Sequence, residues 1–271
     1  MIARLTYTLG RFFRLEAAFF RNCLTRDLQY RGNFILVFFM DIVWYLVNLA
    51  FFKVIYLNTQ SIGGFTEAEV FFFLGTVFVI DALDMSFFAS GLWVLGDHIR
   101  KGDFDIVLTK PVSPMLYASM RYISVGSLLD LVFALCILAT AWWQLGYPVT
   151  LVSLGAYLIL MLCGLAVMYS FQVAFAAVGF IFVNASSGLQ MGFHHLYQFA
   201  MKPETIYKGA LRFALFFVVP VLTISALSPR MILRGFDIYS FALGITTAAV
   251  MLFLSTKFFY WALRRYESAS S

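Results

Sequence analysis

The sequence predicts an all-α integral membrane protein, and two observations support this fold class. First, 62% of the 271 residues are hydrophobic and only 12% are charged, whereas a soluble domain has about half apolar and a quarter charged residues. Second, the apolar residues form six runs separated by polar segments, and about 20 such residues in a helix cross a ~30 Å hydrocarbon core. We therefore expect one transmembrane domain over residues 33–266, preceded by residues 1–32 and followed by a short tail, residues 267–271.

Residues 1–32 predict an amphipathic helix that lies flat at the membrane surface. At about 100° per residue, four arginines share one sector of this helix and several phenylalanines lie opposite. The residues are Arg4, Arg11, Arg14 and Arg21 on one face and Phe12, Phe13 and Phe20 on the other. An arginine face opposed to an aromatic face is typical of an interfacial helix. It anchors the N-terminus in the simpler interpretation, and in the alternative it is an elbow helix that also touches a cytosolic partner.

Six membrane spans are expected after this helix. They cover about residues 34–57, 70–95, 117–145, 151–183, 211–226 and 239–263. The fourth run is too long for a straight crossing, so it must tilt, kink or project into the interface. The fifth contains Pro220 in its interior. We expect that span to be kinked or partly broken, which is tolerated where neighbouring helices satisfy the backbone.

The basic residues predict how the spans are oriented. With six spans, residues 1–33, 96–121 and 184–212 and the tail from Lys257 share one side of the membrane. All but three of the 19 Lys and Arg residues fall on that side, and the exceptions are Lys53, Arg230 and Arg234. Because cytoplasmic segments carry the excess of Lys and Arg, we expect both termini in the cytosol. The net charge of +5 is therefore a topology signal, and no nucleic-acid partner is expected.

Residues 96–114 form the most charged segment between two apolar runs. They hold three aspartates, three basic residues and His98, and a segment this polar lies outside the lipid. Asp97 is a candidate cap for a short helix that Gly102 ends, and Asp103 for a second helix through Thr109. Ser113 and Pro114 are a good N-cap and N1 pair for the next helix. The segment predicts a compact, helical, cytosolic hairpin between the second and third spans, with a solvated loop as the simpler alternative.

The same hairpin resembles a family signature. Gly102-Asp103-Phe104-Asp105, followed by Leu108-Thr109-Lys110-Pro111-Val112-Ser113-Pro114, resembles the GD-hydrophobic-D and L-x-KPVSP signature of an ABC-2-type permease family. Its members are membrane subunits of bacterial ABC export systems. The C-terminal Arg265-Tyr266-Glu267-Ser268-Ala269-Ser270-Ser271 is similar to the RYxSASS ending of one branch, and the length and hydropathy layout agree along the chain.

The resemblance implies a permease subunit in the bacterial plasma (inner) membrane. It implies a six-helix domain that dimerises with itself or with a second permease, and two separate ATPase subunits that dock on the cytosolic hairpins. The expected coupling residues are Asp103, Phe104, Asp105, Ile106, Lys110 and Pro111, with Phe104 or Ile106 as an apolar anchor and Asp105 or Lys110 as a polar partner. ATP and Mg would bind to the partner. The chain has no G-x-x-x-x-G-K-[ST] loop, so we expect no cofactor in it and no enzymatic activity of its own.

Four carboxylates interrupt the apolar runs: Asp41, Asp81, Asp84 and Asp130. Asp81 and Asp84 are three residues apart and would share a helix face. Ionisable groups inside a membrane are costly and face a bundle interior or a wet cavity. They would line a substrate path or relay protons in the functional interpretation. In the structural one they would form internal hydrogen bonds or ion pairs, for example with Lys53, Arg121 or a hydroxyl.

These carboxylates also define the main alternative function, an ion- or proton-coupled secondary transporter. The absence of an evident internal repeat makes it less favoured, because such transporters often contain repeats. A lipid-modifying enzyme is less favoured still, since no clustered catalytic set is visible. The adjacent His194 and His195 point about 100° apart on a helix, so no metal site is expected. The 32 phenylalanines mostly serve packing and the lipid surface, and the remainder fit a path for amphipathic or lipid-like exported substrates.

Overall fold

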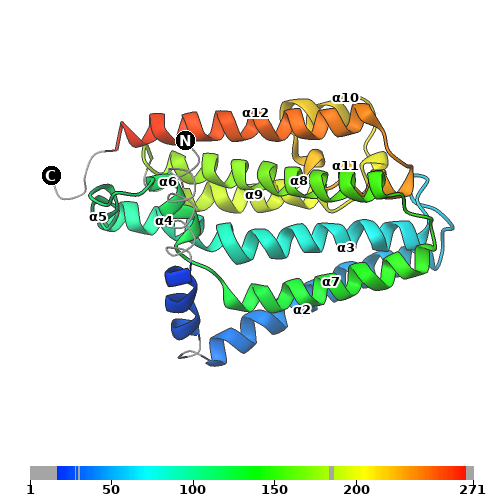
Figure 1. The fold of residues 1–271 in the computed structure, drawn as a ribbon, viewed down its shortest axis with the longest axis horizontal. Coiled ribbons are helices and arrows are strands. Elements are labelled where there is room, and N and C mark those ends of the chain that lie inside the picture. The colour runs from blue at the N-terminus through cyan, green and yellow to red at the C-terminus, as the bar shows by residue number, and fades with distance from the viewer. Residues whose placement is uncertain (1–16, 28, 30, 183–185, 267–271) are drawn as a thin grey trace.

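The computed structural model describes residues 17–27, 29, 31–182 and 186–266. This part of the chain is a bundle of long helices that share one axis, with short helices at both ends (Figure 1). We call the end with the segment 96–114 the hairpin end, and the end with residues 57–66 the loop end. In chain order, the elements are α2 (Arg31–Tyr56), α3 (Glu67–Asp84), the π-helix η1 (Met85–Ala89), α4 (Ser90–Lys101), α5 (Phe104–Leu108), α6 (Pro114–Met120), α7 (Val125–Leu145), α8 (Leu151–Val178), α9 (Ser186–Ala200), η2 (Glu204–Ile206), α10 (Gly209–Phe213), the π-helix η3 (Ala214–Val218), η4 (Val221–Ile224), α11 (Leu227–Leu233) and α12 (Ile238–Leu263).

Five helices in the described part are long and apolar enough to cross a membrane. They confirm the all-α membrane class and match the first four and the last of the six predicted spans. Their ranges are Ile35–Tyr56, Glu67–Lys101, Val125–Leu145, Leu151–Val178 and Ile238–Leu263. The protein is therefore a multi-pass membrane protein.

The second of these helices is longer than expected, because α3, η1 and α4 form one continuous rod of 35 residues. Thr66 starts it with a capping box in which Glu69 is the reciprocal partner. Gly102 ends it in the left-handed conformation, with φ +75°, which glycine adopts without strain. The expectation that Asp97 begins a separate short helix is therefore wrong. Asp97 lies inside α4 and pairs with Arg100 at 2.7 Å.

The predicted fifth span over residues 211–226 is not among the five spanning helices, and the break expected at Pro220 is present. The helix is interrupted at Val219 and Pro220, and the segment consists of α10, η3 and η4. The chain instead runs along the bundle through α9 and the residues after it. The Gln190 side chain donates to the Leu92 carbonyl near the hairpin end, and Thr205 lies beside Gly63 at the loop end.

This change of path moves three basic residues. Lys202, Lys208 and Arg212 come after α9 in the chain and therefore lie toward the loop end. The count from the sequence assigns them to the opposite side, together with the rest of residues 184–212. Among the described residues, the basic excess at the hairpin end is therefore smaller than predicted but keeps its sign. Of the 19 Lys and Arg residues, the six assigned to the loop end are Lys53, Lys202, Lys208, Arg212, Arg230 and Arg234.

The bundle is organised around α3. In its apolar spanning stretch, 78% of the residues of the Glu67–Lys101 rod are buried. The corresponding value is 11% for α2, which lies at the edge of the bundle. Gly75 lets α3 and α7 approach closely, since a Cβ there would lie 2.9 Å from the Leu138 Cα atom. One apolar core fills the bundle from the loop end to its middle, and a second core packs the hairpin end.

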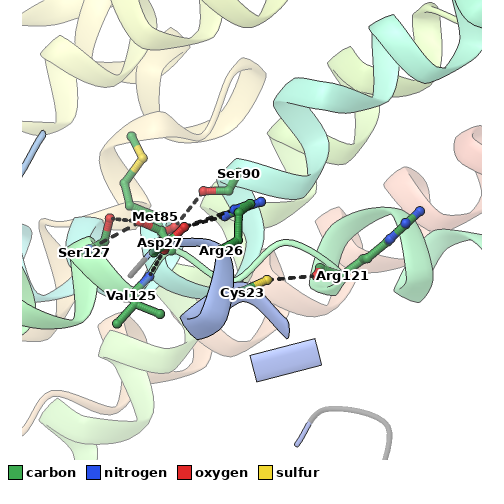
Figure 2. Close-up of polar contacts among 9 residues, drawn as sticks. Cys23, Arg26, Asp27, Met85, Ser90, Arg121, Val125 and Ser127 are labelled. Atoms are coloured by element: carbon green, nitrogen blue, oxygen red, sulfur yellow. Dashed lines mark hydrogen bonds and ion pairs between the residues drawn. The ribbon is translucent and has the colours of Figure 1, made fainter. Parts of the chain in front are cut away.

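A short N-terminal helix packs against the hairpin end (Figure 1). Residues 17–27 are helical, while residues 1–16 of the predicted amphipathic helix lie outside the described part. Phe19 packs edge-on against Tyr117, with ring centroids 5.6 Å apart. Figure 2 shows the polar contacts of this helix: the Cys23 thiol donates to the Arg121 carbonyl, and Asp27 accepts from the Val125 N–H. The helix thus contacts both α6 and the start of α7.

Candidate functional site

The hairpin between α4 and α7 is an ordered unit attached to the rest of the bundle. After Gly102 the chain forms α5, turns, and begins α6 at Pro114. Ser113 accepts from the Leu116 N–H, which confirms the predicted cap. The Ser113 hydroxyl also lies 2.8 Å from the hydroxyl of Tyr260 in α12. The hairpin is therefore linked to the end of the last spanning helix by this hydrogen bond.

The inner face of α5 is buried against the ends of α8 and α12. Phe104 is only 1% exposed, and its ring lies 5.1 Å from that of Phe180 and 6.2 Å from that of Tyr266. Val107 is buried beside it. Burial and the neighbouring Asp105 carboxylate raise the pKa of Tyr266 to about 12. The Tyr266 phenol therefore stays neutral at physiological pH and is available as a hydrogen-bond donor.

The outer face of α5 is apolar and exposed. Ile106 is 62% exposed and Leu108 is 43% exposed, on a short helix that lies beyond the ends of the long helices (Figure 1). Lys101, Asp103, Lys110 and Pro111 are exposed around them. This arrangement of exposed apolar side chains within a polar rim is typical of a protein-docking surface.

The structure divides the predicted coupling residues into two groups. Phe104 is buried, and the half-buried Asp105 lies beside Tyr266. Lys110 is exposed, although its ammonium donates to the Tyr117 hydroxyl at 2.7 Å. Ile106, Asp103 and Pro111 face outward. Asp103 makes no side-chain cap, contrary to the expectation. Of the two expected anchors, only Ile106 is available to a partner, because Phe104 is already packed.

A basic hollow lies beside the hairpin, and the sequence did not reveal it. The hollow has a volume of about 580 Å³ and is lined by the N-terminal helix, the 110–112 turn and α6. Its cationic residues are Arg26, Lys110 and Arg121. Arg121 lies over the rings of Tyr117 and Tyr122, 5.1 and 5.2 Å from their centroids. The segments come from distant parts of the sequence, so no local pattern could have indicated the hollow.

The intramembrane carboxylates form a second candidate site. Asp41 of α2, Asp81 of α3 and Asp130 of α7 line one cavity of about 280 Å³. Asp84 does not join them, although it lies three residues after Asp81. It is fully buried and accepts a hydrogen bond from the Gln172 side chain.

No salt bridge neutralises these carboxylates in the described part of the chain. The proposed partner Lys53 pairs with Glu67 at the loop end, and Arg121 stacks on tyrosines at the hairpin end. The ion-pair interpretation of the sequence is therefore wrong for these two partners. Hydrogen bonding fits better: Gln172 donates to one oxygen of Asp84, and the Tyr197 hydroxyl is a hydrogen-bond neighbour of Asp81. Among the described residues, no cluster of His, Cys, Asp and Glu suits a metal ion.

A family comparison identifies the kind of protein that carries these two sites. The family model described as "ABC-2 family transporter protein" matches residues 42–270, which include the hairpin and every spanning helix from the second onward. The chain belongs to this family. Its members are membrane components of ABC transporters and associate with an ABC ATPase component. The searches of curated proteins and of solved structures each found no match.

The hairpin of this permease has two chemically different sides. Its helix α5 has an exposed apolar face and a buried aromatic face.

Proposed function

We propose that this chain is the permease subunit of an ATP-driven exporter, and that a separate ATPase docks on residues 96–114. The observation that supports this most strongly is Ile106, a large apolar residue 62% exposed on an ordered helix at the end of the bundle. Interface anchors are commonly apolar side chains that enter a partner's pocket, surrounded by polar residues. Asp103 and Lys101 supply such a rim.

The buried side of the hairpin supplies the route by which ATPase motion reaches the membrane. A displacement of α5 would push Phe104 against Phe180 after α8, and against Tyr266 after α12. The Ser113–Tyr260 hydrogen bond adds a second link to α12. Because packed aromatic contacts are stiff, the hairpin and the ends of these two helices would move together.

The complete transporter would contain two permeases and two ATPase copies. The second permease would be another copy of this chain or a different ABC-2 permease. ATP and Mg would bind only to the ATPase subunits. The basic excess at the hairpin end supports the orientation in which the hairpin and both termini are cytosolic in a bacterial inner membrane. The many phenylalanines support an amphipathic or lipid-like substrate.

An ion- or proton-coupled secondary transporter is the second candidate function. One observation favours it: three carboxylates from three helices share one intramembrane cavity whose lining contains His194 but no Lys or Arg. Such groups are typical of ion pathways. The family membership favours ATP-driven transport instead, and the two candidates are separated by whether an ATPase co-purifies.

The test replaces Ile106 with a charge. Ile106→Glu should leave membrane insertion and yield unchanged, because the side chain is exposed, but should reduce ATPase co-purification at least tenfold. Leu57→Glu is the matched control, since Leu57 is 73% exposed at the loop end. The two substitutions change charge and hydrophobicity alike. Equal recovery of the ATPase with both variants would remove Ile106 from the interface, and no ATPase with the wild-type chain would favour the secondary transporter.

A further inference from the structure

The cavity of Asp41, Asp81 and Asp130 has the composition of a cation site. It lies between α2, α3 and α7, and its wall also contains Trp44, Tyr45, Trp93 and His194. Asp81 follows Glu67 by fourteen residues in α3, or about 21 Å at 1.5 Å per residue, which places the cavity near the middle of the bilayer. Carboxylates and aromatic faces both attract cations.

Asp130 is the side chain that most requires a ligand. It is 2% exposed, and no amide, hydroxyl or cationic donor in the described part of the chain reaches either of its carboxylate oxygens. Its acidic neighbours are Asp41, whose side chain hydrogen-bonds to it, and Asp81. Burying a carboxylate without a positive partner is costly. A positive group in the cavity would therefore interact with three carboxyl groups at once.

The size and the opening of the cavity indicate which cation fits. The volume of about 280 Å³ is close to the lower limit of ligand pockets, ~300 Å³, and exceeds what one metal ion fills. Two lining residues, Met40 and Trp93, are more than half exposed, so the cavity opens toward the surface beside α2. A molecule in the bilayer would reach it sideways and leave its apolar part outside.

We propose that this cavity binds the positively charged group of an organic cation, an amine or a quaternary ammonium carried on an apolar body. Asp130 forms the base of the site, Asp41 and Asp81 form its sides, and the Trp44 and Trp93 rings contact the cationic group. This inference deepens the proposed function by naming the substrate class. It rests on that function only for transport, because binding is a property of the isolated chain.

The test measures binding to the chain alone in nanodiscs of phosphatidylcholine, at constant ionic strength. The probe is benzyltrimethylammonium, and its control is neopentylbenzene, the neutral carbon analogue of the same shape. Quenching of tryptophan fluorescence reports occupancy, since two tryptophans line the cavity. We expect saturable quenching by the cation, and none by the neutral analogue. We also expect at least tenfold weaker cation binding to Asp130→Asn and to Asp41→Asn.

Asp84→Asn is the matched control variant, because Asp84 is buried on the same rod but binds Gln172 outside the cavity. Its affinity should stay within twofold of wild type. Size-exclusion elution and helicity check folding, and if Asp130→Asn misfolds, Asp41→Asn on the peripheral α2 carries the test. Wild-type affinity in the cavity variants, equal weakening in Asp84→Asn, or displacement of the probe by equimolar sodium would overturn the proposal.

The outcome is separable from that of the permease test. Loss of cation binding in the cavity variants with no ATPase recovered from the wild-type chain would retain the site and refute the permease. ATPase recovery with identical binding in all variants would retain the permease and refute the site.

Discussion

The ring of Phe104 in the hairpin lies 5.1 Å from the ring of Phe180, in the turn that follows α8. Both side chains are at most 3% exposed. This contact joins a short helix outside the membrane to a spanning helix. It explains why the hairpin holds a fixed position although only five residues form its central helix.

Removing the Phe104 ring should release the hairpin. Phe104→Ala deletes a buried aromatic side chain, and such changes cost about 3–5 kcal/mol. We expect trypsin to cleave faster after Arg100 and Lys101 in the purified protein, because Pro111 blocks cleavage after Lys110. Ile106→Ala is the control, because changes at exposed positions usually stay within about 0.5 kcal/mol. Equal cleavage rates for the two variants would show that α5 is not held by Phe104.

The Tyr266 phenol should titrate with a pKa of about 12, because burial and the Asp105 carboxylate favour its neutral form. A free tyrosine has a pKa near 10. Since the folded pKa is raised, this contribution to stability is complete below about pH 10 and is lost as the pH rises through 12. The measurement is a pH titration of tyrosinate absorbance for the wild type and for Tyr266→Phe. The difference between the two curves should show a single phenol that titrates with a midpoint near pH 12.

Asp105→Asn should move that midpoint down toward the ordinary value. A wild-type midpoint near 10, or one unchanged by Asp105→Asn, would contradict the placement of Asp105 beside Tyr266.

Gln172 should stabilise the folded protein only while residue 84 is an aspartate. Gln172→Leu removes a hydrogen-bond donor from a fully buried acid, and a buried group left unsatisfied costs about 1–3 kcal/mol. We expect a lower melting temperature for this variant in detergent. The double variant Asp84→Leu/Gln172→Leu should recover much of the loss, because both polar partners are then absent. Additive losses in this double-mutant cycle would show that the two side chains are not coupled.

Gly164 should tolerate no side chain. A Cβ there would overlap the carbonyl oxygen of Ile224, where η4 packs against α8. Gly164→Val should therefore reduce folded yield strongly. Gly155→Val in the same helix is the control, because nothing lies within 4 Å of its added Cβ. Similar yields for both variants would contradict the close packing of η4 on α8.

Local chemistry allowed much of the hairpin to be predicted. Ser113 and Pro114 indicated the start of α6, and Gly102 indicated the end of α4. The sequence could not indicate that α4 continues from α3 through a π-turn, since tertiary packing decides that. The sequence does not indicate the path along α9 for a related reason. Residues 184–209 mix polar and aromatic side chains, which does not predict a long helix, yet the Gln190 side chain is satisfied by the Leu92 carbonyl.

The acidic cavity shows the same limit. The sequence indicated each of Asp41, Asp81 and Asp130 as a buried acid, but their convergence depends on how α2 and α7 pack on α3. Likewise, Asp81 and Asp84 share a helix face, yet only the structure shows that one lines the cavity and the other binds Gln172.

Photocrosslinking from position 106 can show whether an ATPase docks on the outer face of α5. A photoreactive phenylalanine analogue replaces Ile106, and the same analogue replaces Leu57 as the control, in cells that express the native partners. We expect a crosslinked product of this chain with a P-loop ATPase from position 106 and none from position 57. Crosslinks only to lipid or to another permease from position 106 would contradict it.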